Sequence, residues 1–128
     1  MFILKIRGSV PGRHCWPDAP ERYTGLRMPH SHNFGFELTI PEETARGIEF
    51  LELAEKCKRF LAVYVHPKPY RLREGTALVS YVPPISSKSC EELAHLLFSW
   101  AEERGLQPLT AEVNEDSLCG AIYKKGES

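Results

Sequence analysis

The sequence lacks the features that mark several large classes of protein. Its 16 Lys and Arg residues are balanced by 17 Asp and Glu residues, for a formal net charge of -1, so no basic excess favours nucleic acid as a partner. No apolar run approaches the ~20 residues of a membrane-spanning helix, and the first residues, MFILKIRGSV, are too short and too strand-like for a signal peptide. These absences predict a cytoplasmic protein that binds neither nucleic acid nor membranes.

The sequence also lacks the short motifs that identify several common kinds of active site. The chain has four cysteines but no C-x-x-C pair, which argues against a thiolate metal site or a redox motif of that type. It has no glycine-rich phosphate loop and no G-x-S-x-G elbow. In a reducing compartment we expect Cys15, Cys57, Cys90 and Cys119 to be free thiols that pack as small apolar side chains.

Alternating apolar residues indicate where the strands lie. A chain of 128 residues suits one modest core, so we expect residues 1–128 to form a single domain. Alternation predicts strands over 2–10 and 30–40, and PLTAEVNEDSLCGAIYKK near the C-terminus reads as two strands that turn at 115–117.

Helical spacing of apolar residues indicates two helices. The first is predicted to begin in PEETARG, from residue 41, and to continue to Leu61. The second follows Ser89 and Glu92, which fit a capping box. Residues 62–86 could hold one or two short strands or an ordered loop. This order predicts an α+β fold in ββααββ order: an antiparallel four-stranded sheet with two helices packed on one face.

Two histidines occupy the apolar face of the second predicted strand. In HSHNFGFELTI, His30 and His32 share the parity of the apolar residues that follow, and residues of one parity point to one face of a strand. The same parity in the first strand leads to His14, unless the intervening Pro-Gly step introduces a bulge. Antiparallel pairing would bring the three imidazoles together, and three histidines with an open fourth position are typical of catalytic zinc. The alternative is a set of surface or hydrogen-bonded core histidines.

A carboxylate continues the apolar face of the third predicted strand. Glu115 has the parity of Leu109, Ala111 and Val113, and a carboxylate on a buried face is costly unless something compensates its charge. It could accept hydrogen bonds from adjacent N–H donors of a guanidine-like ring edge, which would orient a ligand. The alternative is that the strand end simply emerges into water.

These stretches resemble the 6-pyruvoyl- and 6-carboxy-tetrahydropterin synthases, the pterin-binding branch of the tunnelling fold. GRHCW offers His14, and HSHNFGFEL offers His30 and His32 where the family has an H-G-H-N-like strand start. PPISSKSCEELAHLL is similar to the start of the family's second helix. AEVNEDSLCGAIY is similar to its final hairpin, with Glu115 in the place of the pterin anchor. The match is colinear over most of the chain.

The resemblance implies a function and an assembly. The three histidines would bind Zn²⁺, and Glu115 would hold the ring of a pterin-like small molecule. The activity would be that of a zinc-dependent lyase on a substrate like dihydroneopterin triphosphate. Proteins of this fold form rings of subunits, commonly hexamers, which agrees with the tendency of open sheet edges to pair.

Departures from the family pattern leave the catalytic groups open. Leu26 stands where the family has its catalytic cysteine, four residues before the first histidine of H-x-H. His66 could be the acid–base group, but Val65 replaces the acid that would orient it, so a surface histidine is the alternative. Cys15 adjoins His14 but has the opposite parity. A non-catalytic pterin- or purine-binding protein is therefore a second hypothesis, and a purely structural assembly protein is a third.

Overall fold

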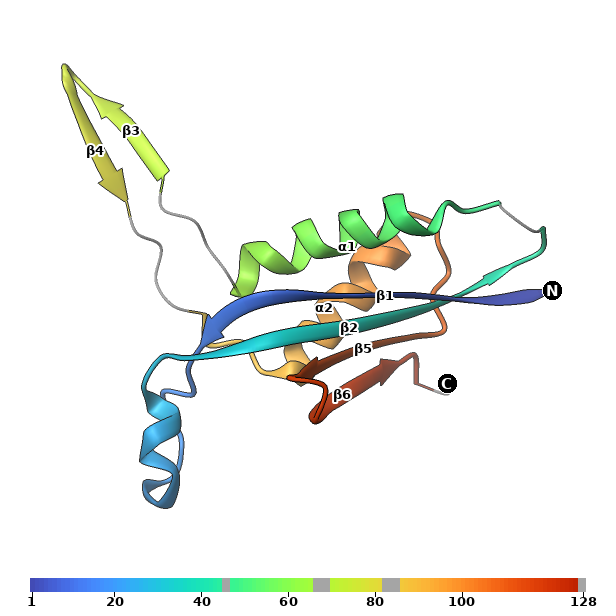
Figure 1. Cartoon of the computed structure of the whole chain (residues 1–128), viewed down its shortest axis with the longest axis horizontal. Helices are drawn as coiled ribbons and strands as arrows, with labels where there is room; N and C mark the ends of the chain where they lie inside the picture. The colour runs from blue at the N-terminus through green and yellow to red at the C-terminus, as the bar shows by residue number, and fades with distance from the viewer. Residues whose placement is uncertain (45–46, 66–69, 82–85, 127–128) are drawn as a thin grey trace.

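Four strands form one antiparallel sheet in the order β1-β2-β5-β6 (Figure 1). The structure is a computed structural model that describes residues 1–44, 47–65, 70–81 and 86–126. The strands of the sheet are β1 (Phe2–His14), β2 (His30–Glu42), β5 (Thr110–Glu115) and β6 (Cys119–Lys124). The predicted α+β class with a four-stranded antiparallel sheet is confirmed.

The first two strands pair without a shift along their whole length. Every residue of β1 from Phe2 onward has a partner on β2, and the last pair is His14 with His30. The Pro-Gly step therefore introduces no bulge. A side chain at Gly12 would lie 2.7 Å from side-chain and backbone atoms of Val65, so glycine lets β1 pass close beside the end of the first helix. The parity count along β1 consequently holds as far as His14.

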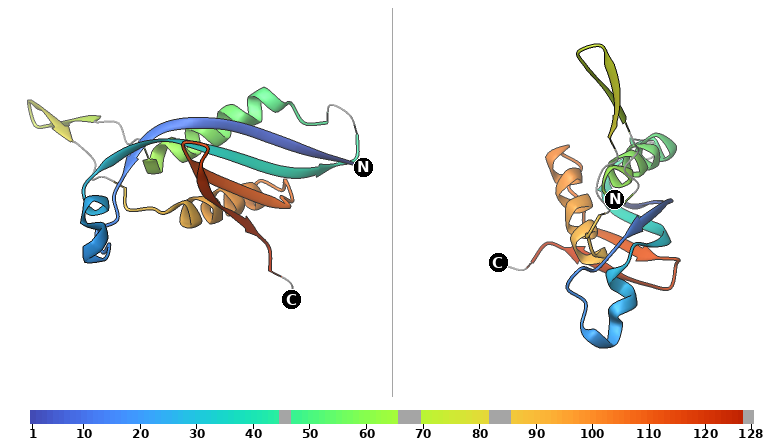
Figure 2. Two further views of the ribbon diagram at one scale, coloured as in Figure 1. Left: turned by 60° about the horizontal axis from the view of Figure 1, so that its bottom comes forward. Right: turned by 90° about the vertical axis from the view of Figure 1, so that its left-hand side faces the viewer.

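Two helices cover one face of the sheet, as predicted (Figure 2). They are α1 (Phe50–Val65) and α2 (Cys90–Glu103). Leu53, Cys57, Leu61 and Val65 recur every four residues along α1 and are all buried, which is the spacing of a helix with one apolar side. They meet the buried face of the sheet, where Leu38 and its neighbours on β2 are almost completely covered.

The first helix begins later than the sequence pattern predicts. The start predicted at residue 41 is wrong, because β2 continues to Glu42, which pairs with Phe2. The helix itself begins at Phe50. The Glu49 carboxylate accepts hydrogen bonds from the backbone N–H of Leu51, at 3.2 Å, and of Glu52, at 2.6 Å. A side-chain acceptor of this kind satisfies N–H groups that a helix start leaves without partners.

The start of the second helix is fixed by a capping box, as predicted. The Ser89 hydroxyl accepts from the backbone N–H of Glu92 at 3.1 Å, and the Glu92 carboxylate accepts from the backbone N–H of Ser89 at 3.4 Å. The reciprocal pair makes Cys90 the first residue of the helix.

The segment left open at 62–86 contains the end of α1 and a separate hairpin. Its strands are β3 (Tyr70–Glu74) and β4 (Ala77–Tyr81), which pair only with each other within the described ranges. A short 3-10 helix, η1 (Glu21–Arg27), lies between β1 and β2. None of the helices described has the length and apolar content needed to span a membrane.

Candidate metal centre

The three histidines predicted from parity lie together at one end of the sheet. The ring centroid of His14 is 4.5 Å from that of His30 and 5.2 Å from that of His32, and His30 and His32 are 5.0 Å apart. One nitrogen from each ring lies within 4.8 Å of the other two. His14 is buried and the other two rings are partly exposed. The cluster is therefore open to solvent on one side.

One nitrogen of every ring in this histidine cluster faces a hydrogen-bond acceptor. His14 Nδ1 lies 3.0 Å from the carbonyl oxygen of Lys88, and His30 Nδ1 lies 2.9 Å from that of Met28. His32 Nδ1 lies 2.7 Å from a carboxylate oxygen of Asp116. Carbonyl and carboxylate oxygens cannot donate, so each Nδ1 must carry the proton.

A neutral ring with its proton on Nδ1 offers the lone pair of Nε2 to a metal. Neutral imidazole with its other nitrogen hydrogen-bonded is the usual state of a metal-ligating histidine. Three imidazole ligands suit Zn²⁺, and the open side leaves room for a further ligand. His14, His30 and His32 therefore fit a zinc ion by their chemistry as well as by their proximity.

Glu115 lies against the same nitrogens. Its carboxylate oxygens are 3.2 Å from His14 Nε2 and 3.5 Å from His32 Nε2. Ligand atoms bound to a tetrahedral zinc ion at about 2.0–2.1 Å lie about 3.3 Å apart. The carboxylate is thus within reach of a metal held by the histidines, and its side chain is 32% exposed. Glu115 lies on the face of β5 that parity predicts, because Ala111 and Val113 on the same face are buried.

Asp116 is a contact of the cluster that sequence patterns did not indicate. Besides His32, its carboxylate accepts from the backbone N–H of Asn33 at 2.7 Å. The hydrogen bond from Asn33, and next that from His32, hold the pKa of Asp116 below its ordinary value. The carboxylate is therefore ionised at neutral pH.

Cys90 is a second unpredicted neighbour, reached through Glu115. Its thiol is buried and hydrogen-bonds to the Glu115 carboxylate. Burial first, and then the negative charges of Glu115 and Glu91, raise the pKa of Cys90 to about 12. At neutral pH this cysteine is a protonated thiol that donates to Glu115, although it lies at the N-terminus of a helix, where thiolates are usually favoured.

The structure describes two of the three other residues singled out in the sequence, Leu26 and Cys15. Leu26, in the place of the family's cysteine, lies in η1 and is 40% exposed. The backbone N–H of Cys15 donates to the carbonyl of Ser86 at 2.9 Å, which ties the end of β1 to the segment before α2. His66, predicted as a possible acid–base group, lies outside the described residues.

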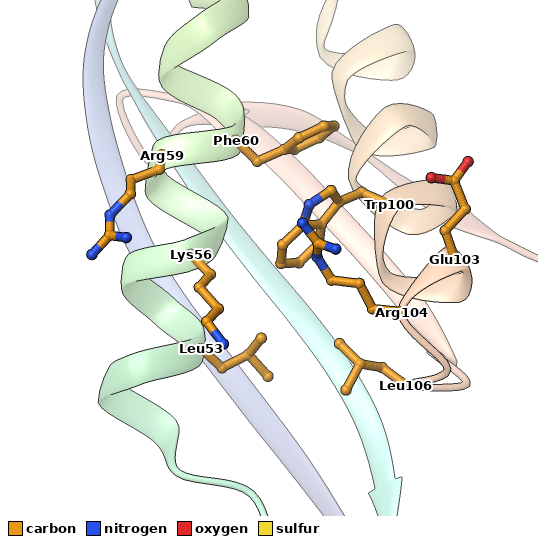
Figure 3. A pocket seen from close by; sticks show the side chains of 8 residues that line it. All are labelled: Leu53, Lys56, Arg59, Phe60, Trp100, Glu103, Arg104 and Leu106. Carbon is orange, nitrogen blue, oxygen red and sulfur yellow. The ribbon is translucent and has the colours of Figure 1, made fainter.

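A separate hollow of about 800 Å³ lies between α1 and α2, away from the histidines (Figure 3). The ammonium group of Lys56 at its rim is paired with Glu52 at 3.3 Å. The guanidinium of Arg104 lies 4.5 Å over the ring of Trp100. Arg59 also lines the hollow. Lys56 and Arg104, two of the cations that line the hollow, are therefore already engaged within the chain.

Comparison with known proteins finds similarity among solved structures. No family model and no curated protein matches the sequence. Among solved structures, the chain is similar to the crystal structure of 6-pyruvoyl tetrahydropterin synthase from Plasmodium vivax. The TM-score is 0.48 at 12% sequence identity, over 99% of this chain and 100% of that one. A likeness at this level concerns the arrangement of strands and helices alone.

Proposed function

We propose that the chain is a zinc-dependent, pterin-directed lyase that acts on a substrate like dihydroneopterin triphosphate. One observation carries the proposal: three imidazoles from two strands converge, each with its Nδ1 proton committed to an acceptor. The colinear sequence resemblance to tetrahydropterin synthases supplies the substrate class. The zinc ligands would be His14, His30 and His32.

Different residues of the chain would have different roles at this site. When bound, zinc acts as a Lewis acid toward an oxygen of the substrate side chain. Glu115 would accept hydrogen bonds from the N–H groups of the pterin ring. Its contacts with His14 and His32 mean that a ring held by Glu115 would lie beside the metal. We propose His66 as an acid–base group of the reaction.

We propose that the protein works as a homo-oligomer, a hexamer in the form that the resemblance implies. Within the described residues, β6 pairs only with β5, and β1 pairs with β2 and otherwise makes one isolated bridge, between His14 and Ser86. The sheet therefore has two open edges, and edges of this kind pair readily with other chains. Closure of such edges between copies would give a ring.

A second candidate function is pterin or purine binding without catalysis. It is favoured by Leu26, which cannot transfer a proton from the position where the family carries a cysteine. The buried Cys90 thiol keeps its proton at neutral pH, so it is a poor substitute base. The zinc site and Glu115 would then serve to hold a ligand.

Incubation of the zinc-loaded chain with dihydroneopterin triphosphate separates the two functions. The lyase is expected to shorten or rearrange the pterin side chain, which chromatography of the fluorescent pterins would detect. A binder is expected to show saturable binding of an unchanged pterin. If the chain neither binds nor converts the pterin, both functions are wrong.

Glu115→Gln is the informative variant in this assay. Loss of a charge-assisted hydrogen bond costs about 1.5–3 kcal/mol, so pterin binding should weaken by about 10- to 100-fold. The zinc content of the variant should stay near that of the wild type, because the three imidazoles remain. Pterin binding unchanged in Glu115→Gln would remove Glu115 from the proposal and leave the metal centre standing.

A further inference from the structure

We propose that Asp116 is a positioning residue of the metal centre, holding the proton of His32 on Nδ1 and so presenting Nε2 to the metal. This inference rests on the metal centre proposed above. It concerns a residue of the turn between β5 and β6, 84 positions away from His32 in the sequence.

The two oxygens of Asp116 have separate donors. Oδ2 lies 2.7 Å from His32 Nδ1, and Oδ1 accepts from the backbone N–H of Asn33 at 2.7 Å. The carboxylate therefore holds the imidazole and the backbone of the next residue on β2 at the same time. Both donors point at it, so an acceptor is required at both oxygen positions.

The backbone conformation of the turn places the Asp116 carboxylate beside β2. Asp116 has φ 55° and Ser117 has φ 60°, a left-handed conformation that Asp and Asn tolerate better than most residues. The backbone N–H of Asp116 donates to the carbonyl of Asn33 at 2.8 Å. The backbone N–H of Ser117 donates to Asn114 Oδ1 at 3.1 Å. The first bond fixes the turn against β2 and the second closes the turn on β5, both independently of the imidazole.

His32 differs from the other two histidines in its partner. His14 and His30 donate to backbone carbonyls, whereas His32 donates to an ionised carboxylate. Hydrogen bonds to charged acceptors are stronger, and a carboxylate behind an imidazole makes its other nitrogen a better metal ligand. Asp116 should therefore affect metal affinity as well as ring orientation.

Asparagine at position 116 could not accept hydrogen bonds from both His32 and the backbone N–H of Asn33. An amide has one oxygen, so its NH₂ group must face either the Asn33 N–H or His32. Facing His32, the NH₂ would favour the tautomer with the proton on Nε2, and that nitrogen would then have no lone pair for a metal. Asparagine nevertheless suits the left-handed backbone, so the turn itself should survive in Asp116→Asn.

The test compares zinc affinity in Asp116→Asn, Asp116→Ala and the wild type, with Asp18→Asn as the matched control. Asp18 is an exposed residue outside the histidine cluster. Competition with a chromophoric chelator should show zinc binding about 10- to 100-fold weaker in the Asp116 variants and unchanged in the control. The visible absorption of bound Co²⁺ should also shift in Asp116→Asn, because the geometry at His32 changes.

A second measurement needs no metal. Long-range ¹H–¹⁵N spectra of the neutral imidazoles should place the His32 proton on Nδ1 in the wild type and on a mixture of nitrogens in Asp116→Ala. The inference is overturned if the variants bind zinc within about twofold of the wild type and keep the proton on Nδ1. If the wild-type chain binds no zinc, the proposed function fails separately, and the spectra still decide the role of Asp116.

Discussion

Replacement of His32 with alanine is expected to remove bound zinc from the chain. His32 supplies one of three imidazoles whose ligand nitrogens lie within 4.8 Å of one another, and its removal leaves two imidazoles beside Glu115, one nitrogen ligand short of the proposed site. After dialysis against buffered zinc, elemental analysis should fall from about one zinc per chain to below about one-tenth.

The matched control for this experiment is His95→Ala. His95 is exposed on α2 and stacks on the ring of Tyr123 at 4.4 Å, outside the cluster. The zinc content of the His95→Ala variant should equal that of the wild type. Full zinc occupancy in His32→Ala would refute the assignment of ligands, and equal loss in both variants would point to unspecific binding by histidine.

Phe34→Ala should produce the largest loss of stability near the site. Phe34 is 1% exposed, and its ring meets those of His14 and His32 edge to face, with centroids 5.0 and 5.8 Å apart. Removing a buried phenylalanine side chain costs about 3–5 kcal/mol, because lost burial and a residual cavity add together. Urea unfolding of the metal-free chain should show this decrease in the free energy of unfolding.

Ile122→Ala is the control for Phe34→Ala. Ile122 also lies on a strand of the sheet, in β6, but it is 62% exposed. Its replacement should change the free energy of unfolding by no more than about 0.5 kcal/mol. A loss in Phe34→Ala as small as that of the control would mean that Phe34 is not packed as described.

Parity along two strands was sufficient to predict where the histidines meet. An unshifted β1–β2 register carries the alternation from the core residues to His14, and antiparallel pairing then sets His14 opposite His30. The same rule placed Glu115 on the buried face of β5, opposite Phe34 of β2. These residues were predictable because a regular strand fixes the direction of each side chain.

Contacts made by turns and helix ends were not predictable in this way. Asp116 reaches His32 from a left-handed turn, where alternation no longer applies. Cys90 reaches Glu115 from the first residue of a helix, and the sequence pattern indicated only a small buried side chain. The late start of α1 at Phe50 was missed because the pairing of Glu42 with Phe2 extends the strand into an apparently helical stretch.

The two unpredicted residues extend the chemistry of the site beyond its ligands. Asp116 fixes His32, and the Cys90 thiol donates to the Glu115 carboxylate. Hydrogen bonds to the outer side of a ligand set its protonation and direction. A search restricted to the three histidines and Glu115 would therefore leave out two groups that hold them in place.

X-ray absorption at the zinc edge tests most directly whether the three histidines bind one metal ion. For the zinc-loaded chain we predict scattering from three imidazoles, bound through nitrogen at about 2.0–2.1 Å, with the remaining coordination from oxygen. A sulfur ligand at about 2.3 Å, or fewer than three imidazoles around the zinc, would contradict the account.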